Sequence, residues 1–191
     1  YLSMALLSVE KRRVTGGNAQ LWEDSQVKGF GSKPTEIAWH YTIGRWSPKI
    51  FRDKYLKLEE PLPGEKSLDE YPCVWFSKSE DYEPTALKFI VRDGKRVGRC
   101  QNVQQQAKEH GGLLRIGVDS SRLHPLKHVI KRRGLLDGLD QLIRIGIEEG
   151  ANPHRDWMVS YKPVKIQQWL KIQVSGNVSD DGIIVWEDVP F

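Results

Sequence analysis

The chain has 191 residues, of which 39% are hydrophobic and 28% charged, and this is the composition of one globular domain rather than a disordered chain. No run of 18 apolar residues occurs, which argues against a membrane-spanning helix and against a membrane as partner. The formal net charge of +4 permits a polyanionic partner without requiring one.

The two cysteines, Cys73 and Cys100, stand 27 positions apart. Neither belongs to a CxxC pair or has a histidine at ligand spacing, so we expect no metal site. Two cysteines do not make a disulfide framework, which favours a reducing, cytoplasmic setting.

The first 35 residues are polar and contain the chain-breaking stretches TGGN and KGFGSKP. They predict an N-terminal arm that precedes a single domain over residues 36–191. The elements expected in the first half of that domain are a strand over 36–42, a helix that begins at Ser47-Pro48, a polar loop over 59–72, a strand over 73–77 and, within 79–91, a helical turn opened by Pro84.

The second half of the domain is expected to be richer in strands. A helix over 102–112 stops at Gly111-Gly112, which is a usual C-terminal signal. The further expected elements are a buried strand over 113–119, a helix over 135–150, strands over 156–164, 169–175 and 183–189, and a turn over 179–182. Together these patterns predict a mixed α+β domain.

The stretch HPLKHVIKRRG at 124–134 carries four cations and two histidines with no acidic residue. The cations are Lys127, Lys131, Arg132 and Arg133. They form either an ordinary solvated face or a surface that binds the phosphates of a nucleic acid.

Two stretches, WHYT at 39–42 and PCVWFSKSEDYEPTA at 72–86, hold the side chains best suited to bind a ligand. In a strand, His40 and Thr42 point to the same face and Tyr41 points to the other. The imidazole and hydroxyl groups suit a ribose or an amide, and the aromatic rings of the second stretch suit a flat heterocycle. A single histidine or a pair of aromatic residues on an apolar strand is more often part of a core.

These two stretches resemble the ADP-ribosyltransferases of the diphtheria-toxin and poly(ADP-ribose)-polymerase branch. HYT stands where that family commonly has HGT on its first core strand, and CVWFS stands where it has a strand similar to GIYFA. The resemblance covers residues 38–86, and the later strands only by general layout. It implies a split antiparallel β-sheet core flanked by helices, with NAD as the cofactor consumed.

The resemblance also implies roles for single residues. His40 and Thr42 would hold the NAD ribose, and Arg45 would reach a phosphate of the dinucleotide. Trp75 and Tyr82 would stack on nicotinamide. The implied catalytic residues are His40, Tyr82 and Glu83, and the implied NAD-binding residues are His40, Tyr41, Thr42, Arg45, Trp75, Ser77 and Tyr82.

The sequence departs from the family pattern at two places. Tyr41 replaces a small residue, and the late stretch DWMVSYKPVKIQQWL lacks the glutamate that the family tends to place there. The candidate carboxylates are Glu83 first, Asp156 second, and then Glu148, Glu149 and Glu187. The missing glutamate keeps two alternatives open: an RNA 2′-phosphotransferase-like enzyme, and a non-catalytic module of the same fold that binds nucleic acid or a partner.

The activity that the resemblance implies is transfer of ADP-ribose from NAD to a macromolecule, with RNA or DNA as the target that the basic stretch favours. Small free-standing domains of this family often act as toxins or antiviral-defence effectors. For such a toxin we expect an antitoxin protein as partner.

Overall fold

The structure is a computed structural model that describes residues 35–58, 72–133 and 137–191. The predicted N-terminal arm and the predicted loop over 59–72 lie almost entirely outside these residues.

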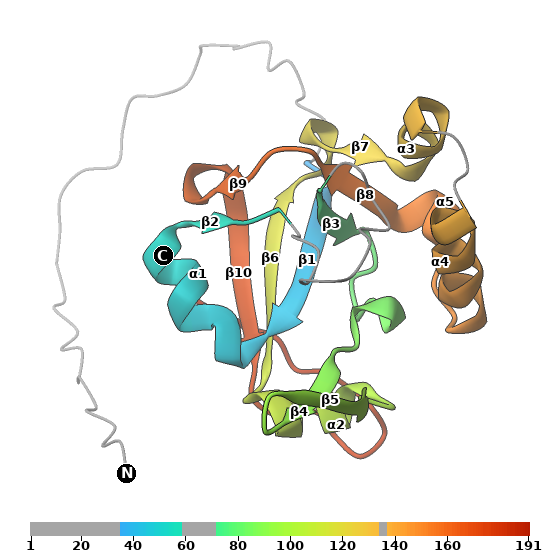
Figure 1. Cartoon of the computed structure of the whole chain (residues 1–191). Coiled ribbons are helices and arrows are strands. Elements are labelled where there is room, and N and C mark those ends of the chain that lie inside the picture. The colour runs from blue at the N-terminus through green and yellow to red at the C-terminus, as the bar shows by residue number, and fades with distance from the viewer. Residues whose placement is uncertain (1–34, 59–71, 134–136) are drawn as a thin grey trace, which may run out of the picture. The chain divides into compact units, whose positions relative to one another are not determined.

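The described residues form a mixed α+β fold with one large antiparallel sheet and a few helices (Figure 1). Seven strands follow the order β11-β10-β6-β1-β3-β8-β7, and β2-β9 and β4-β5 form two small further sheets. The strands are β1 Ile37–Ile43, β2 Tyr55–Leu56, β3 Val74–Ser77, β4 Phe89–Arg92, β5 Lys95–Arg99, β6 Leu113–Asp119, β7 His124–Pro125, β8 Trp157–Ser160, β9 Val164–Lys165, β10 Trp169–Ser175 and β11 Glu187–Asp188. The helices are α1 Ser47–Asp53, α2 Val103–His110, α3 Leu126–Arg133, α4 Asp137–Glu148 and α5 Pro153–Asp156.

The strands β1 and β6 form the centre of the sheet. They pair along their whole length, from Ile37 opposite Asp119 to Ile43 opposite Leu113. The apolar run LLRIGVD makes β6 buried on both faces, as its sequence predicts. On its other side β6 pairs with β10, so these strands form a continuous part of the sheet.

The sheet opens on the other side of β1. Only one residue pair, Trp39 opposite Ser77, joins β1 to β3. β3 in turn pairs with β8 along four residues. The sheet therefore has two parts, β11-β10-β6-β1 and β3-β8-β7, that meet at a single pair and separate beyond it.

Two apolar clusters support this arrangement. The larger one includes Leu114, Ile116 and Ile172 of β6 and β10, and residues of α1 pack against it. The smaller one surrounds β8 and is closed by α3 and α4, through residues such as Val129 and Ile143. Helices and strands from both halves of the chain thus stabilise the two sides of the opening.

Several expected elements are confirmed, and others differ. The helix α2 ends at Gly111, which has a positive φ of 70°. The strand expected over 183–189 is reduced to the two residues of β11. The strand expected over 156–164 is interrupted by a turn, where the Ser160 hydroxyl donates a hydrogen bond to the Lys162 carbonyl, so that β8 and β9 are separate.

The hairpin of β4 and β5 was not predicted. Its turn residues Asp93 and Gly94 have φ values of 49° and 74°, as a type I′ turn requires. Asp-Gly between apolar runs is the sequence signal for such a turn, and it is present at 93–94.

Candidate functional site

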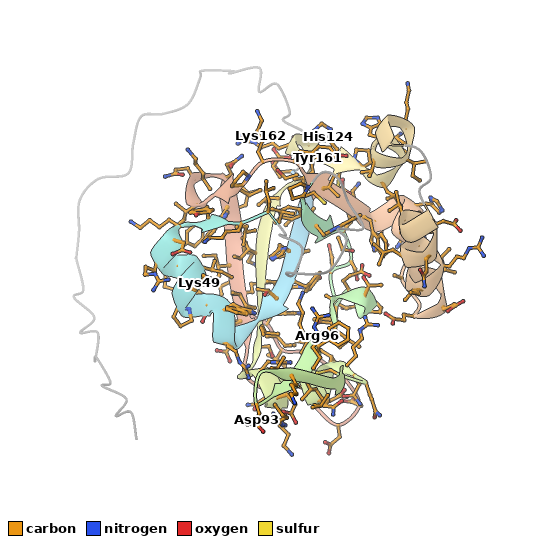
Figure 2. The ribbon with its side chains drawn as sticks, in the orientation of Figure 1. Lys49, Asp93, Arg96, His124, Tyr161 and Lys162 are labelled. Carbon is orange, nitrogen blue, oxygen red and sulfur yellow. The ribbon has the colours of Figure 1, made fainter. Side chains whose placement is uncertain are left out.

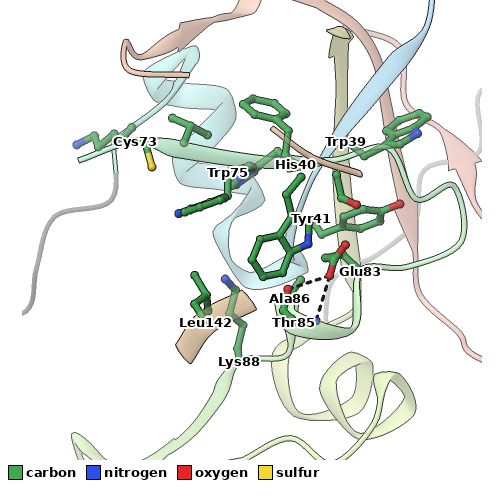
Figure 3. A pocket seen from close by; sticks show the side chains of 15 residues that line it. Trp39, His40, Tyr41, Cys73, Trp75, Glu83, Thr85, Ala86, Lys88 and Leu142 are labelled. Atoms are coloured by element: carbon green, nitrogen blue, oxygen red, sulfur yellow. Dashed lines mark hydrogen bonds between the residues drawn. The ribbon is translucent and has the colours of Figure 1, made fainter. Parts of the chain in front are cut away.

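A cavity of about 400 Å³ lies where β1 and β3 separate (Figure 3). This volume falls within the range of about 300–1,000 Å³ that is usual for small-molecule sites. Its wall includes residues 39–41 of β1, residues 73–77 at β3, parts of the segment 83–88, Lys57, Leu142 of α4 and Trp157 of β8. The opening in the sheet is thus the feature that creates the cavity.

His40 spans the opening from β1 to β3. Its Nδ1 lies 2.9 Å from the main-chain oxygen of Trp75. Because a carbonyl oxygen only accepts, Nδ1 carries the proton, and a neutral ring then has Nε2 as an acceptor. Burial lowers the pKa of His40 to about 4, with a further decrease from the charge of Lys88, against the opposing hydrogen bond to Trp75. The ring is therefore neutral at pH 7 and presents an acceptor.

The lowered pKa of His40 makes folding pH-dependent. At pH values between 6.5, the ordinary pKa of histidine, and about 4, the unfolded chain binds a proton at His40 that the folded chain does not bind. We expect the free energy of unfolding to fall by about 3 kcal/mol on this account as the pH falls through that window. Urea unfolding at pH 7 and pH 4 measures the loss. His40→Asn keeps an N–H near the Nδ1 position but does not titrate, so equal pH dependence of both chains would contradict the prediction.

Glu83 is a buried carboxylate in the cavity wall. It precedes the short 3₁₀ helix Pro84–Ala86, and its Oε1 accepts hydrogen bonds from the Thr85 hydroxyl at 2.9 Å and from the Thr85 amide at 3.5 Å. Figure 3 shows both bonds beside the cavity. Thr85 therefore fixes the orientation of a negative charge in the same cavity as His40.

The other four candidate carboxylates lie outside the cavity wall. Asp156 forms a two-point ion pair with Arg155, at 2.7 and 2.9 Å. Glu149 binds Arg99. The last two, Glu148 and Glu187, are exposed on α4 and β11. Of the five candidates, the structure places only Glu83 with His40.

Three more of the expected NAD-binding residues line the cavity: Tyr41, Trp75 and Ser77. The Tyr41 ring packs against Tyr82, and its hydroxyl donates to the Ser79 carbonyl. Thr42 is buried beside Leu114 and does not line the cavity, so the structure does not bring it together with His40 there.

Arg45 and Tyr82 likewise lie outside the wall of the cavity. Arg45 is exposed, and its guanidinium donates to the Glu109 carbonyl at 2.9 Å. The Tyr82 ring packs edge-on against Tyr41 with 5.2 Å between ring centres, and its hydroxyl accepts a hydrogen bond from Gln106. Burial raises the pKa of Tyr82. Tyr82 is thus a support for Tyr41 rather than a part of the wall.

The residues of the wall that were not predicted include Lys57, Thr85, Lys88 and Trp157. The Trp157 ring meets Trp75 edge-on at 5.7 Å, and the two indoles form an aromatic corner. Trp157 stands near the start of the strand expected over 156–164, and this position is the feature of the sequence that could have indicated it. The two lysines stand in no motif, and nothing in the sequence singles them out.

The loop between β3 and Glu83 is held through three consecutive carbonyls. Tyr41 donates its hydroxyl to the carbonyl of Ser79, Arg115 donates to that of Glu80, and Trp186 donates its indole N–H to that of Asp81 at 3.3 Å. Each anchor comes from a different part of the chain, so the position of Glu83 depends on the folded sheet.

Arg115 is the central anchor of this loop. Its guanidinium lies between two indole rings, 4.1 Å from the ring centre of Trp39 and 4.2 Å from that of Trp186. Its Nε donates to Gln173 at 2.7 Å. Sequence reasoning missed Arg115, although a lone arginine inside the apolar strand LLRIGVD must find partners when buried.

The basic stretch forms the helix α3, which packs through Leu126 and Val129 on the smaller apolar cluster. Lys127 and Lys131 are exposed on it. Arg132 and Arg133 belong to its last turn, and their side chains lie outside the described residues.

Within residues 35–58, 72–133 and 137–191, no three His, Cys, Asp or Glu side chains are grouped to hold a metal ion. The helices of the same residues are all too short or too polar to cross a membrane. Comparison of the chain with protein-family models, curated proteins and solved structures finds no match.

Proposed function

We propose that the chain is an NAD-dependent ADP-ribosyltransferase whose NAD site is the cavity between β1 and β3. The observation that carries the proposal is the meeting of three groups in one cavity: the neutral His40, the aromatic corner of Trp75 and Trp157, and the buried Glu83. A split antiparallel sheet is also what the resemblance of residues 38–86 implies.

Each group has a task in this reaction. Nε2 of His40 accepts a hydrogen bond from a ribose hydroxyl, and the indoles of Trp75 and Trp157 offer a surface for nicotinamide. The bond between ribose C1′ and nicotinamide N1 breaks, its electron pair stays on N1, and neutral nicotinamide leaves. Positive charge develops on the ribose, and Glu83 stabilises it. The acceptor atom then bonds to C1′ and gives its proton to Glu83.

Two measurements test the proposal. Quenching of tryptophan fluorescence reports NAD binding, and release of nicotinamide reports the reaction. His40→Ala is expected to abolish release, because the ribose loses its hydrogen-bond partner. His154→Ala on α5 is the matched control, since His154 is an exposed histidine outside the cavity wall. Absence of NAD binding by the unchanged chain, or full activity of His40→Ala, would overturn the proposal.

A second candidate, the RNA 2′-phosphotransferase-like enzyme, is favoured by Lys57 and Lys88, which place two cations in the same wall as His40. An assay that supplies NAD together with an RNA carrying a 2′-phosphate distinguishes the two candidates, because only a 2′-phosphotransferase removes that phosphate. The toxin role and the antitoxin partner stay predictions of the resemblance.

A further inference from the structure

The β4–β5 hairpin concentrates positive charge. Residues 88–99 hold five cations and one acid, a surplus equal to the formal net charge of +4 of the whole chain. The cations are Lys88, Arg92, Lys95, Arg96 and Arg99, and the acid is Asp93 in the turn. Arg92 and Arg99 are paired with the carboxylates of Glu109 and Glu149, so Lys95 and Arg96 are the exposed cations of the hairpin that attract a polyanion.

One face of the hairpin combines this charge with exposed apolar side chains. Residues directly opposite in an antiparallel pair share a face, and Val91 stands opposite Arg96. Phe89 lies on the same face, two residues before Val91, and the Arg96 guanidinium lies 4.6 Å from its ring centre. Phe89 is 46% exposed and Val91 43%. On the other face, Arg92 binds Glu109 of α2 at 2.5 Å, so this face is turned to the protein.

The hairpin is joined directly to the wall of the cavity. Lys88 lines the cavity, and β4 begins at the next residue. Arg99, at the end of β5, donates to the carbonyls of Leu87 at 3.1 Å and Thr85 at 3.2 Å and also binds Glu149, the residue after α4. A ligand on the hairpin therefore lies next to the segment that carries Glu83.

We propose that the face of Phe89, Val91 and Arg96 binds single-stranded nucleic acid and presents it to the cavity as the ADP-ribose acceptor. This inference rests on the proposed function for the acceptor role. Proteins that bind single strands combine cations along the backbone with aromatic rings on which bases stack. Arg96 beside Phe89 supplies both, and Lys95, the neighbour of Arg96 in β5, adds a second exposed cation at the turn. A strand without a partner also lets one nucleotide enter a cavity, which a stacked duplex does not.

The experiment measures binding of the full chain to fluorescein-labelled 12-nucleotide single strands of DNA and of RNA, by anisotropy over a range of salt concentrations and without NAD. The double variant Lys95→Glu/Arg96→Glu is expected to bind at least tenfold more weakly, with a salt slope that is shallower by about 1.4. Phe89→Ala is expected to lose about tenfold, and Phe89→Tyr to keep the affinity, because a ring remains for stacking.

The matched control is Lys162→Glu/Lys165→Glu, which makes the same change of charge at exposed positions. Figure 2 shows Lys162 at the opposite end of the molecule from Arg96 and Asp93. Equal loss in this control would show that only overall charge matters and would overturn the proposal.

Two further outcomes would overturn it. If charge reversal of Lys127 and Lys131 lowers the affinity and charge reversal in the hairpin does not, nucleic acid binds at α3, as the basic stretch alone suggests. No binding of either single strand would indicate a protein or small-molecule acceptor. Because the binding assay contains no NAD, its failure is separate from failure of nicotinamide release, which tests the proposed function by itself.

Discussion

Replacement of Glu83 by glutamine is expected to reduce nicotinamide release by about 10²–10³-fold, the effect of losing one fixed electrostatic contact to a transition state. The side chain keeps its size and its acceptor oxygen for Thr85, so the fold should remain. The negative charge is lost, and it is the charge that stabilises the developing positive ribose. Single-turnover release of nicotinamide from NAD measures the effect.

Glu148→Gln is the matched control, because Glu148 is a sequence-predicted candidate that the structure leaves exposed on α4. Its activity should equal that of the unchanged chain. If Glu83→Gln retains full activity while Asp156→Asn loses it, the catalytic carboxylate is Asp156 and the geometry of the cavity has been misinterpreted. The pair of variants therefore decides between the first and second candidates.

Replacement of Arg115 by methionine is expected to lower the free energy of unfolding by about 5 kcal/mol, the lower end of the sum of the contacts that are lost. The change leaves the Glu80 carbonyl and the Gln173 amide oxygen without their donor, and it removes the cation from between Trp39 and Trp186. Hydrogen bonds to charged groups contribute about 1.5–3 kcal/mol each, and a desolvated cation–π contact about 2 kcal/mol. Urea unfolding at pH 7 measures the difference.

Arg122→Met is the control for this variant, since Arg122 is exposed and pairs with Asp119 only at 4.0 Å. Its stability should change by less than about 0.5 kcal/mol. Arg115→Lys should fall between the two, because an ammonium reaches one carbonyl but cannot bind Glu80 and Gln173 together. A loss as small as that of Arg122→Met would show that Arg115 does not hold the loop.

The sequence predicts those elements whose structure depends on the pattern of neighbouring residues. The buried strand over 113–119 follows from an unbroken apolar run, and the end of α2 follows from Gly111. His40, Trp75 and Glu83 could be selected together because they lie within about 45 residues whose strand period and aromatic content are visible in the sequence. The mixed α+β class follows from the alternation of such segments.

The rest depends on contacts between segments that are distant in the chain. Which of His40, Tyr41 and Thr42 faces the cavity is decided by the point at which β1 separates from β3, and pairing of strands 35 residues apart leaves no local signal. Trp157 reaches the cavity because β8 pairs with β3, and Lys57 reaches it from the chain directly after β2. Arg115 is visible as an anomaly in an apolar strand, but its partners at Glu80 and Gln173 are not.

The separation of β1 from β3 has one more consequence. Beyond the Trp39–Ser77 pair, the two strands border the cavity with main-chain amide and carbonyl groups that would otherwise pair across the sheet. His40 takes up one of them, the Trp75 carbonyl. A planar carboxamide, which has both a donor and an acceptor, is complementary to such an internal edge. Because every sequence carries the same main-chain groups, recognition of this kind tolerates wide changes in the side chains around it.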